Sequence, residues 1–276
     1  MPLSKDEFDL VRKVVRDRSA IVLEEGKEYL VEARLNPVAR EFKLPNLSTL
    51  IQKLKGVGEY LVIQKVVEAM TTNETFFFRD IYPFDSLKKN ILPDLLSRRS
   101  PSGPLNIWCA ASSTGQEPYT IAMLIAENFP QLKNDGRLKI IASDINETVL
   151  NKAREGIYTQ LEVNRGLPAS LLVKYFQKKT LNWQLKDDLR KMVEYRNINL
   201  CQPLPQLPPL DLVFIRNVLI YFDVETKKKV LAGIKTMLKP DAYLYLGGAE
   251  TTFGIDEDFE RIRFDQAVCY QLKRKK

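Results

Sequence analysis

Histidine is absent from the 276 residues of this chain. Imidazole is the side chain that most often carries protons near neutral pH, and it is also the commonest metal ligand in proteins. Its absence excludes a histidine general base, a Ser-His-Asp triad and the usual histidine-containing metal sites. We therefore expect chemistry that needs neither imidazole nor a bound metal.

Cysteines and long apolar runs are scarce as well. Cys109, Cys201 and Cys269 are widely spaced, which argues against a disulfide framework or a zinc cluster. Cys109 and Cys269 each lie in an apolar run, where packing in the core is the usual role. No apolar run reaches the roughly 20 residues that span a bilayer, and the first residues lack the apolar core of a signal peptide. The sequence predicts a cytoplasmic protein without membrane insertion.

The excess of charge of one sign is small. The chain has 42 Lys and Arg against 35 Asp and Glu, a net charge of +7, and residues 273–276 supply four of the basic side chains. A nucleic-acid surface needs basic residues clustered on one face, and no stripe of this kind with interleaved aromatic residues is present. We expect no nucleic-acid partner.

The first 80 residues predict a small helical domain. Ser4 and Glu7 form a capping-box pattern before the apolar residue Phe8. Apolar residues at helical spacing continue with almost no strand character. Further helices are expected over residues 27–42, 47–55 and 59–70, and a connecting helix over 84–98.

Residues 81–276 predict a second, larger domain of different character. The Pro- and Gly-containing segment 100–104 breaks the chain. After it, strands alternate with helices, a pattern typical of a doubly wound, mostly parallel α/β sheet. The expected strands are 105–110, 138–143, 193–198, 210–215, 242–246 and 263–272. The expected helices are 117–128, 147–154 and 225–238.

A charged segment of about residues 175–192 interrupts this alternation. It fits an inserted β-hairpin or small subdomain, and a solvated surface loop fits it about as well.

Polar side chains follow the first two strands of the predicted sheet, at the edge where ligands bind in open α/β sheets. The turn after residue 110 has one glycine and no G-x-G-x-x-G pattern, so it does not favour a dinucleotide pyrophosphate. S-adenosylmethionine has no phosphate and needs no such turn. Asp144 could accept hydrogen bonds from ribose hydroxyls, or it could cap the next helix. Glu117 could face the cofactor's positive end, or it could be an ordinary acid in a first helical turn.

The segment from Thr71 to Arg79 carries a similar ambiguity. Thr-Thr-Asn can cap a helix, the three phenylalanines at 76–78 can be core, and an arginine at such a position is usually solvated. Asn73, Thr75 and Arg79 flanking those phenylalanines also suit a wall that closes a pocket. Both interpretations stay open on the residues alone.

Five segments in this order resemble the CheR-type chemotaxis receptor methyltransferases. They are Met70 to Arg79, Ala111 to Tyr119, Ala142 to Ile145, Ala153 to Tyr158 and Arg216 to Phe222, and together they span most of the chain. The resemblance implies a class I S-adenosylmethionine-dependent methyltransferase of Rossmann-like fold. It also implies an enzyme that esterifies glutamate side chains of chemotaxis receptors for sensory adaptation.

The resemblance implies roles for matching positions. Arg79 and Tyr221 would be catalytic, facing the reacting centre, and Arg216 would face it as well. Asp144 would hold the ribose, and Asn199 and Leu200 would border the adenine. The cofactor-binding set is Asn73, Thr75, Arg79, Glu117, Asp144, Asn199, Leu200, Arg216 and Asn217.

The resemblance also implies a receptor-docking helix in the first domain, with Arg34, Arg40 and Lys43 as candidates for meeting acidic receptor helices. Because Glu32 and Glu41 intervene, an ordinary solvated face of mixed charge is the alternative.

The chain departs from the family pattern at two places. Gly247-Gly248-Ala249-Glu250 stands where His-Ser-Glu is usual, so the role of that histidine cannot be filled here. The inserted segment lacks the glycine-rich turn of members that bind a receptor's C-terminal pentapeptide, which argues against such tethering.

The expected reaction suits a chain without histidine. A glutamate carboxyl group has a pKa of about 4.3, so it is ionised at neutral pH and needs no general base. Two alternatives remain: methylation of another acceptor, such as a nucleic acid or small molecule, and a signalling module that binds S-adenosylmethionine without catalysis. The Asn/Asp-Pro-Pro-aromatic motif of base-methylating enzymes is absent after the fourth strand, where Arg216 to Leu219 stand instead.

Overall fold

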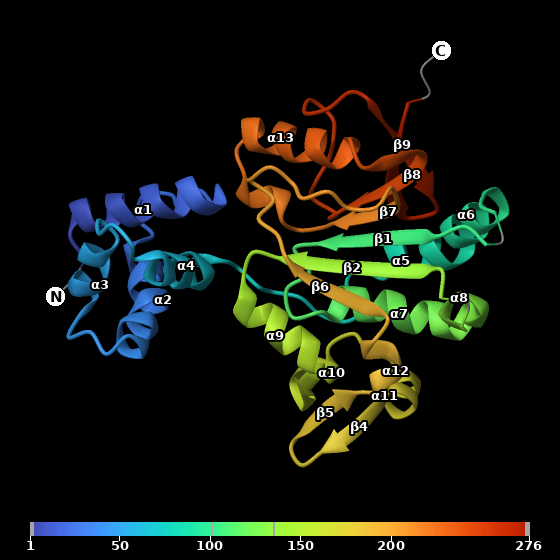
Figure 1. Cartoon of the computed structure of the whole chain (residues 1–276), viewed down its shortest axis with the longest axis horizontal. Helices are drawn as coiled ribbons and strands as arrows, with labels where there is room; N and C mark the ends of the chain where they lie inside the picture. The colour runs from blue at the N-terminus through green and yellow to red at the C-terminus, as the bar shows by residue number, and fades with distance from the viewer. Residues whose placement is uncertain (1–2, 101, 135, 274–276) are drawn as a thin grey trace.

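The computed structural model describes residues 3–100, 102–134 and 136–273. Figure 1 shows a helical domain at one side of a larger α/β domain. The helical domain consists of α1 (Lys5–Ser19), α2 (Glu28–Glu41), α3 (Leu47–Lys53) and α4 (Tyr60–Met70). Their buried residues form a core of their own, separate from the two cores of the sheet. No helix in the described ranges is both long and apolar enough to cross a bilayer.

The start of α1 follows directly from its sequence. The Ser4 hydroxyl accepts a hydrogen bond from the Glu7 N–H, and the Glu7 carboxylate accepts one from the Ser4 N–H. This reciprocal pair satisfies donors that a helix start leaves free, and it confirms the predicted capping box. Phe8, Val11 and Val15 follow at helical spacing and are buried.

The connection between the domains is less regular than the predicted helix over 84–98. It consists of α5 (Tyr82–Ser86), a π-helical turn η1 (Leu87–Ile91) and α6 (Leu92–Arg98). The π turn precedes Pro93, whose ring has no N–H and crowds the preceding turn.

The main sheet has the strand order β6-β2-β1-β7-β8-β10-β9. The pairs β6–β2, β2–β1, β1–β7 and β7–β8 are parallel, and β10 pairs antiparallel with both β8 and β9. This confirms the predicted doubly wound, mostly parallel sheet. The strands are β1 (Leu105–Ala110), β2 (Leu138–Asp144), β6 (Val193–Asn197), β7 (Leu210–Ile215), β8 (Leu238–Leu246), β9 (Phe259–Phe264) and β10 (Ala267–Leu272).

The single final strand predicted over 263–272 is wrong. The chain forms a hairpin there, and Asp265 at its turn has φ 51°, in the left-handed region. The sequence did not predict this turn because its two residues, Asp265 and Gln266, are neither glycine nor proline, the residues that most strongly mark turns.

Helices cover both faces of the sheet, and alternate strand residues enter the two cores. In β1, Ile107 and Cys109 pack with α7 (Gln116–Asn128) on one face, whereas Trp108 packs with α13 (Val224–Lys235) on the other. Both Cys109 and Cys269 are fully buried, as expected.

A second, small antiparallel sheet has the order β3-β5-β4. Strands β4 (Phe176–Lys179) and β5 (Asn182–Leu185) lie in the predicted insertion and form a hairpin, which excludes the solvated-loop alternative there. The third strand, β3 (Ile157–Thr159), precedes the predicted range; three residues are too few to show a strand pattern. The remaining helices are α8 (Pro130–Asn134), α9 (Glu147–Glu155), α10 (Gln160–Asn164), α11 (Ala169–Tyr175) and α12 (Asp187–Arg190).

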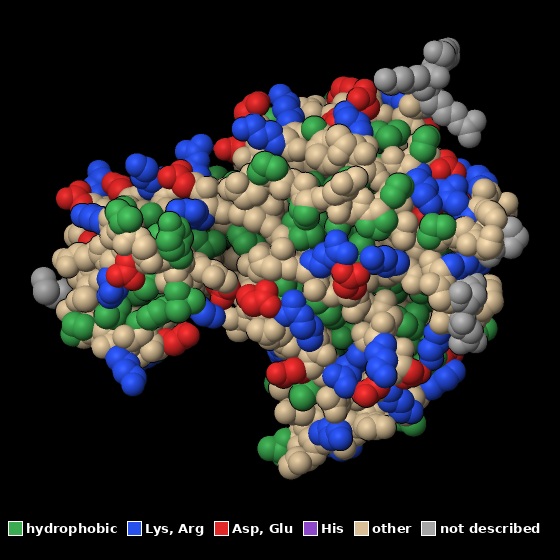
Figure 2. All heavy atoms as spheres, viewed as in Figure 1, with side chains coloured by type: hydrophobic (Ala, Val, Ile, Leu, Met, Phe, Trp, Pro, Cys, Tyr) green, Lys and Arg blue, Asp and Glu red, His purple; other side chains and the backbone are tan. Residues whose placement is uncertain are grey.

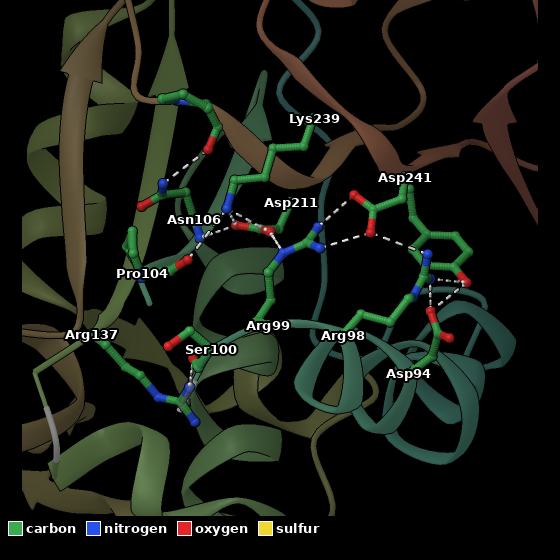
Figure 3. A network of polar contacts seen from close by, with 12 residues as sticks. Asp94, Arg98, Arg99, Ser100, Pro104, Asn106, Arg137, Asp211, Lys239 and Asp241 are labelled. Atoms are coloured by element: carbon green, nitrogen blue, oxygen red, sulfur yellow. Dashed lines mark hydrogen bonds and ion pairs between the residues drawn. The ribbon is translucent and has the colours of Figure 1, made fainter. Parts of the chain in front are cut away.

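A charged network lies at the amino ends of the strands, the edge away from the expected ligand site (Figure 3). The fully buried Asp211 accepts hydrogen bonds from Arg99, from Lys239 and from the backbone of Asn106. Arg99 also pairs with Asp241 and holds the pKa of that carboxyl below its usual range. Because each buried charge has partners, the network fixes the end of α6 on the sheet.

Candidate active site

A cavity of about 900 Å³, which includes open space at its mouth, lies at the carboxyl ends of β1, β2 and β7. The helical domain contributes part of its wall, through the end of α1 and the segment after α4. All ten predicted site residues line it: Asn73, Thr75, Arg79, Glu117, Asp144, Asn199, Leu200, Arg216, Asn217 and Tyr221. Segments distant in the sequence therefore meet in one place, as expected for a doubly wound sheet.

The end of α1 is a part of the wall that the sequence did not reveal. Ser19 and Ile21 line the cavity. The Asn199 amide donates a hydrogen bond to the Arg18 carbonyl at 2.6 Å, and the Cys201 thiol donates one to the Ser19 carbonyl at 3.1 Å. These contacts attach the helical domain to the loop after β6.

The segment from Thr71 to Arg79 forms an irregular wall and not a helix start. The Ser113 hydroxyl donates a hydrogen bond to the Asn73 carbonyl at 2.8 Å, and the Asn73 amide donates one to the Thr71 hydroxyl at 2.9 Å. Phe77 is fully buried, whereas the Arg79 guanidinium donates to the Glu74 carbonyl and lies over the ring of Phe76. The pocket-wall interpretation is confirmed, and the helix-cap interpretation is wrong.

The backbone around the cavity is strained at several residues other than glycine. Phe78, Asp80, Ala111, Ser113 and Asn217 all have φ between 49° and 65°. Left-handed conformations cost free energy for such residues and cluster at functional sites. Here they turn the ends of two strands and of the wall segment sharply toward the cavity.

Gly115 is the one glycine of the turn after β1. Its φ is 91°, and an added Cβ would lie 2.6 Å from the Tyr195 hydroxyl and 2.9 Å from Cβ of Ala153. The turn requires glycine both for its conformation and for close packing, and not for approach to a phosphate.

Asp144 ends β2 and is 6% exposed. Its carboxylate accepts hydrogen bonds from the Ser113 and Asn146 N–H groups, both at 2.9 Å. Burial raises the pKa of the Asp144 carboxyl, and these hydrogen bonds oppose the rise. Asn146, and not Asp144, caps α9, so the capping alternative for Asp144 is wrong. A carboxylate can accept about four hydrogen bonds, so the Asp144 carboxylate can accept further hydrogen bonds from a ligand in the cavity.

Arg216 is buried at the end of β7 between two acids. Its guanidinium lies 2.7 Å from the Glu117 carboxylate and 2.7 Å from the Asp80 carboxylate, and it also donates to the Arg79 carbonyl at 3.0 Å. Burial raises the pKa of the Glu117 carboxyl, and the Arg216 charge opposes the rise. The ion pair connects the first turn of α7 to the loop that carries Arg79.

The loop after β7 carries Asn217 and Tyr221. Residues Leu219–Tyr221 form a 3₁₀ turn, η2. Within the described residues the Tyr221 hydroxyl has no hydrogen-bond partner, and the residue lines the cavity. Glu250 accepts hydrogen bonds from three backbone N–H groups of this loop. No local pattern indicates this role of Glu250, which is the last residue of the segment 247–250, where the chain departs from the family pattern.

Unpartnered polar atoms at the cavity fit a polar ligand. Among the described residues, the Ser112 hydroxyl, the Asn217 amide oxygen and Nε of Arg216 are buried without a hydrogen-bond partner. Buried polar atoms normally have partners, from protein, water or ligand. Ile145, Ile198 and Leu200 give the same cavity an apolar part. An apolar slot beside an acid and polar groups fits S-adenosylmethionine.

The predicted docking residues do not form one group. The Arg34 guanidinium donates hydrogen bonds to the Met70 and Thr71 carbonyls, at 2.8 and 3.0 Å, and to the Thr72 hydroxyl. Arg40 and Lys43 are exposed. Over the face in Figure 2, basic and acidic side chains are interspersed on the helical domain.

Sequence comparison places the chain among known proteins. Residues 73–268 match the sequence model of the CheR methyltransferase SAM binding domain, and residues 6–71 match that of the CheR methyltransferase all-alpha domain. The chain belongs to the CheR methyltransferase family. The two matches meet near residue 72, whereas the predicted domain boundary at residue 80 stays a prediction.

Members of the CheR family resemble the chain along almost its whole length. Chemotaxis protein methyltransferase Cher2 of Pseudomonas putida is 38% identical over 97% of this chain and 98% of its own. Chemotaxis protein methyltransferase 1 of Pseudomonas aeruginosa is 37% identical over 99% of this chain and all of its own. The chemotaxis protein methyltransferase of Escherichia coli is 34% identical over 94% of this chain and 89% of its own.

Membership of the CheR family confirms the resemblance drawn from the sequence. The chain is an S-adenosylmethionine-dependent methyltransferase, and its larger domain is the one that binds the cofactor. The helical domain and the small antiparallel sheet complete the expected fold class.

Proposed function

We propose that the chain transfers a methyl group from S-adenosylmethionine to glutamate side chains on the cytoplasmic helices of chemotaxis receptors. One observation carries the proposal: the ten side chains expected from the CheR resemblance converge on a single cavity. The relatives that match the chain along nearly their whole length are named chemotaxis protein methyltransferases, which supports receptors as the acceptor. Action on receptor helices implies a cytoplasmic location.

The cofactor roles follow from the CheR resemblance and agree with the chemistry of the side chains. Asp144 accepts hydrogen bonds from the ribose hydroxyls, and Asn199 and Leu200 border the adenine. Asn73, Thr75 and Asn217 offer hydrogen-bonding groups to the amino-acid part, where Glu117 faces the ammonium. The support is that these residues line one cavity, and that Asn217 retains a buried oxygen without a partner within the described chain.

The reaction itself requires alignment and little proton transfer. When bound, S-adenosylmethionine would supply a methyl group carried on its sulfonium. An ionised carboxylate oxygen can attack that methyl carbon without a general base, and the methyl–sulfur bond breaks to release S-adenosylhomocysteine. Tyr221 donates a hydrogen bond that orients the glutamate carboxylate, and Arg79 attracts that carboxylate to the cavity. The Arg216 guanidinium is paired with Glu117 and Asp80 and is therefore not assigned to the acceptor carboxylate. Because opposite charges are neutralised as the bond forms, a dry cavity favours the reaction over water.

Receptor docking is assigned to the helical domain, with residues 1–80 as the docking unit and 81–276 as the catalytic unit. Arg40 and Lys43 are exposed and can steer acidic receptor helices. Arg34 contributes differently, since its guanidinium is engaged with the segment after α4. Pentapeptide tethering is not part of the proposal, because residues 177–192 contain no glycine.

The decisive experiment incubates the chain with methyl-labelled cofactor and receptor-rich membranes. Base-labile methyl ester on receptor glutamates is the expected product, and Arg79→Ala and Tyr221→Phe should reduce its rate without loss of the folded state. Cofactor binding without ester would indicate a non-catalytic module, and label on nucleic acid or a small molecule would indicate another acceptor. Either result would overturn the proposal, and full rates in both variants would overturn the two catalytic assignments.

A further inference from the structure

The Glu250 carboxylate accepts four backbone hydrogen bonds. Its Oε2 accepts from the N–H groups of Asn217 at 2.8 Å and Gly247 at 2.6 Å. Its Oε1 accepts from the N–H groups of Val218 at 2.9 Å and Ile220 at 3.2 Å. Three of the four donors belong to the short loop between β7 and Tyr221. Bonds from N–H groups to an ionised carboxylate are stronger than bonds between neutral groups.

This arrangement is an anion-binding nest of backbone N–H groups that the chain fills with its own side chain. The nest exists because Asn217 is left-handed, with φ 58°, which turns consecutive N–H groups toward one centre. Backbone N–H groups directed at a common point need an acceptor there. Without Glu250 the loop would have to rearrange or take up water or another anion.

The acceptor itself is held firmly. The Glu250 N–H donates to the Gly247 carbonyl at 2.9 Å, so residues 247–250 form a turn that closes on itself. A Cβ on Gly247 would lie 2.7 Å from the Glu250 carboxylate and 2.8 Å from the backbone nitrogen of Asn217. There is no room at this point for another side chain, and the turn fixes where the carboxylate lies.

We propose that Glu250 is the positioning residue of the methyl-transfer site, acting through the Asn217–Tyr221 loop backbone without touching cofactor or acceptor. Glu250 itself does not line the cavity, whereas Asn217, Val218 and Tyr221 do. The inference rests on the proposed function, in which Tyr221 orients the acceptor carboxylate. A displacement of about 1 Å at such a residue costs on the order of 100-fold in rate.

The test compares Glu250→Gln with Glu257→Gln. Glu257 lies on the same connection after β8, is exposed, and accepts one backbone hydrogen bond from Gly254. Gln at 250 keeps the shape but turns an N–H₂ group toward two N–H donors. We expect kcat for receptor methylation to fall about 10- to 100-fold. The Kd for S-adenosylhomocysteine, measured by calorimetry, should rise by a much smaller factor than kcat falls, because Asn217 is only one of several residues assigned to the cofactor. Glu257→Gln should behave as wild type.

A double-mutant cycle separates positioning from general loosening of the fold. If Glu250 acts through Tyr221, then Glu250→Gln should cost much less in a Tyr221→Phe background. The same loss in both backgrounds would overturn the inference, as would a wild-type rate for Glu250→Gln while Tyr221→Phe is slow. If the proposed function itself is wrong, the wild-type chain will form no methyl ester, and this result is obtained before any variant is compared.

Glu250→Asp covers the case in which Glu250→Gln does not fold. The shorter side chain keeps the charge but withdraws it by one methylene from the loop. We expect a folded protein, judged by its thermal transition, in which kcat falls by a larger factor than cofactor affinity. A wild-type kcat for Glu250→Asp would also overturn the inference.

Discussion

Nη1 of Arg216 lies 2.7 Å from Oε2 of Glu117 at the base of the cavity. The Arg216 side chain is 2% exposed and that of Glu117 is 12% exposed. Glu117 lies in the first turn of α7 and Arg216 directly follows β7, so their ion pair holds the start of α7 against the end of β7. Such a pair contributes mainly to geometry, because the cost of burying both charges offsets much of their attraction.

Replacing Arg216 by methionine should destabilise the chain by about 3–5 kcal/mol, because it leaves buried Glu117 without its cation. Arg261→Met is a matched control, since Arg261 is exposed on β9. Chemical denaturation gives the free energies of unfolding. The loss should increase with pH. Burial raises the pKa of Glu117 and the Arg216 charge opposes that rise, so the folded variant holds the proton to a higher pH than the folded wild type. The variant therefore loses more stability than wild type as pH rises from the usual carboxyl range through the raised pKa. Equal free energies in the two variants would contradict the role assigned to the pair.

Cofactor affinity should depend on the ionisation of Asp144. Burial raises the pKa of its carboxyl, and ribose hydroxyls donate stronger hydrogen bonds to the ionised form, in which both oxygens accept. Affinity for S-adenosylhomocysteine should therefore rise with pH from the usual carboxyl range up to the raised pKa, and stay level above it. Calorimetry in buffers of different ionisation enthalpy would detect the proton released on binding.

Asp144→Asn provides the control for this dependence. The amide should bind more weakly at every pH and show no acid limb, because no proton is exchanged at position 144. An acid limb that persists in Asp144→Asn would assign the titration to another group, such as Glu117.

Much of the site could be predicted because its residues follow pattern rules. Asp144 is the last residue of one buried strand and Arg216 directly follows another, and the carboxyl ends of parallel strands meet at one edge of a sheet. The five segments that resemble the CheR family supplied the roles, which position alone left open. For Asp144 the residues could not distinguish a ligand from a helix cap, since both uses place an acid at the same point.

Other parts of the site depend on contacts between distant segments. Ser19 and Ile21 reach the cavity only because the end of α1 packs on the loop at Asn199, about 180 residues later in the chain. No local pattern at Ser19 signals such a contact. The function of Glu250 could not be predicted for the same reason. Its partners are backbone N–H groups, which every residue except proline has, so no residue type in the sequence indicates them.

The adjacent glycines 247 and 248 should respond differently to alanine. A Cβ on Gly247 would lie 2.7 Å from both the Asn217 amide nitrogen and the Glu250 carboxylate, whereas one on Gly248 would meet no atom within 4 Å. Gly247→Ala should destabilise the chain by about 1–3 kcal/mol and slow methylation. Gly248→Ala should be neutral, or stabilising by about 0.4–1 kcal/mol. Thermal unfolding and the esterification rate test this, and equal effects at the two positions would contradict the crowding at Gly247.

The three basic residues of the helical domain should separate into two functions. Arg34→Ala removes donors to the Met70 and Thr71 carbonyls, and the segment that bears Asn73 should loosen. Hydrogen bonds from a charged group contribute about 1.5–3 kcal/mol to stability, and cofactor binding would have to supply part of this free energy to order the loosened segment. The Kd for S-adenosylhomocysteine should therefore rise by up to about 10-fold. Receptor KM should change less.

Arg40→Ala and Lys43→Asn should show the opposite pattern. Both side chains are exposed, and asparagine suits the left-handed φ of 54° at position 43. Charges at the rim of an interface act mainly on the rate of encounter. Receptor KM should therefore rise, with a weaker dependence on salt, while cofactor Kd stays unchanged. If Arg34→Ala instead raised receptor KM and left cofactor Kd alone, Arg34 would belong with the docking residues, and its hydrogen bonds to the wall segment would be incidental to cofactor binding.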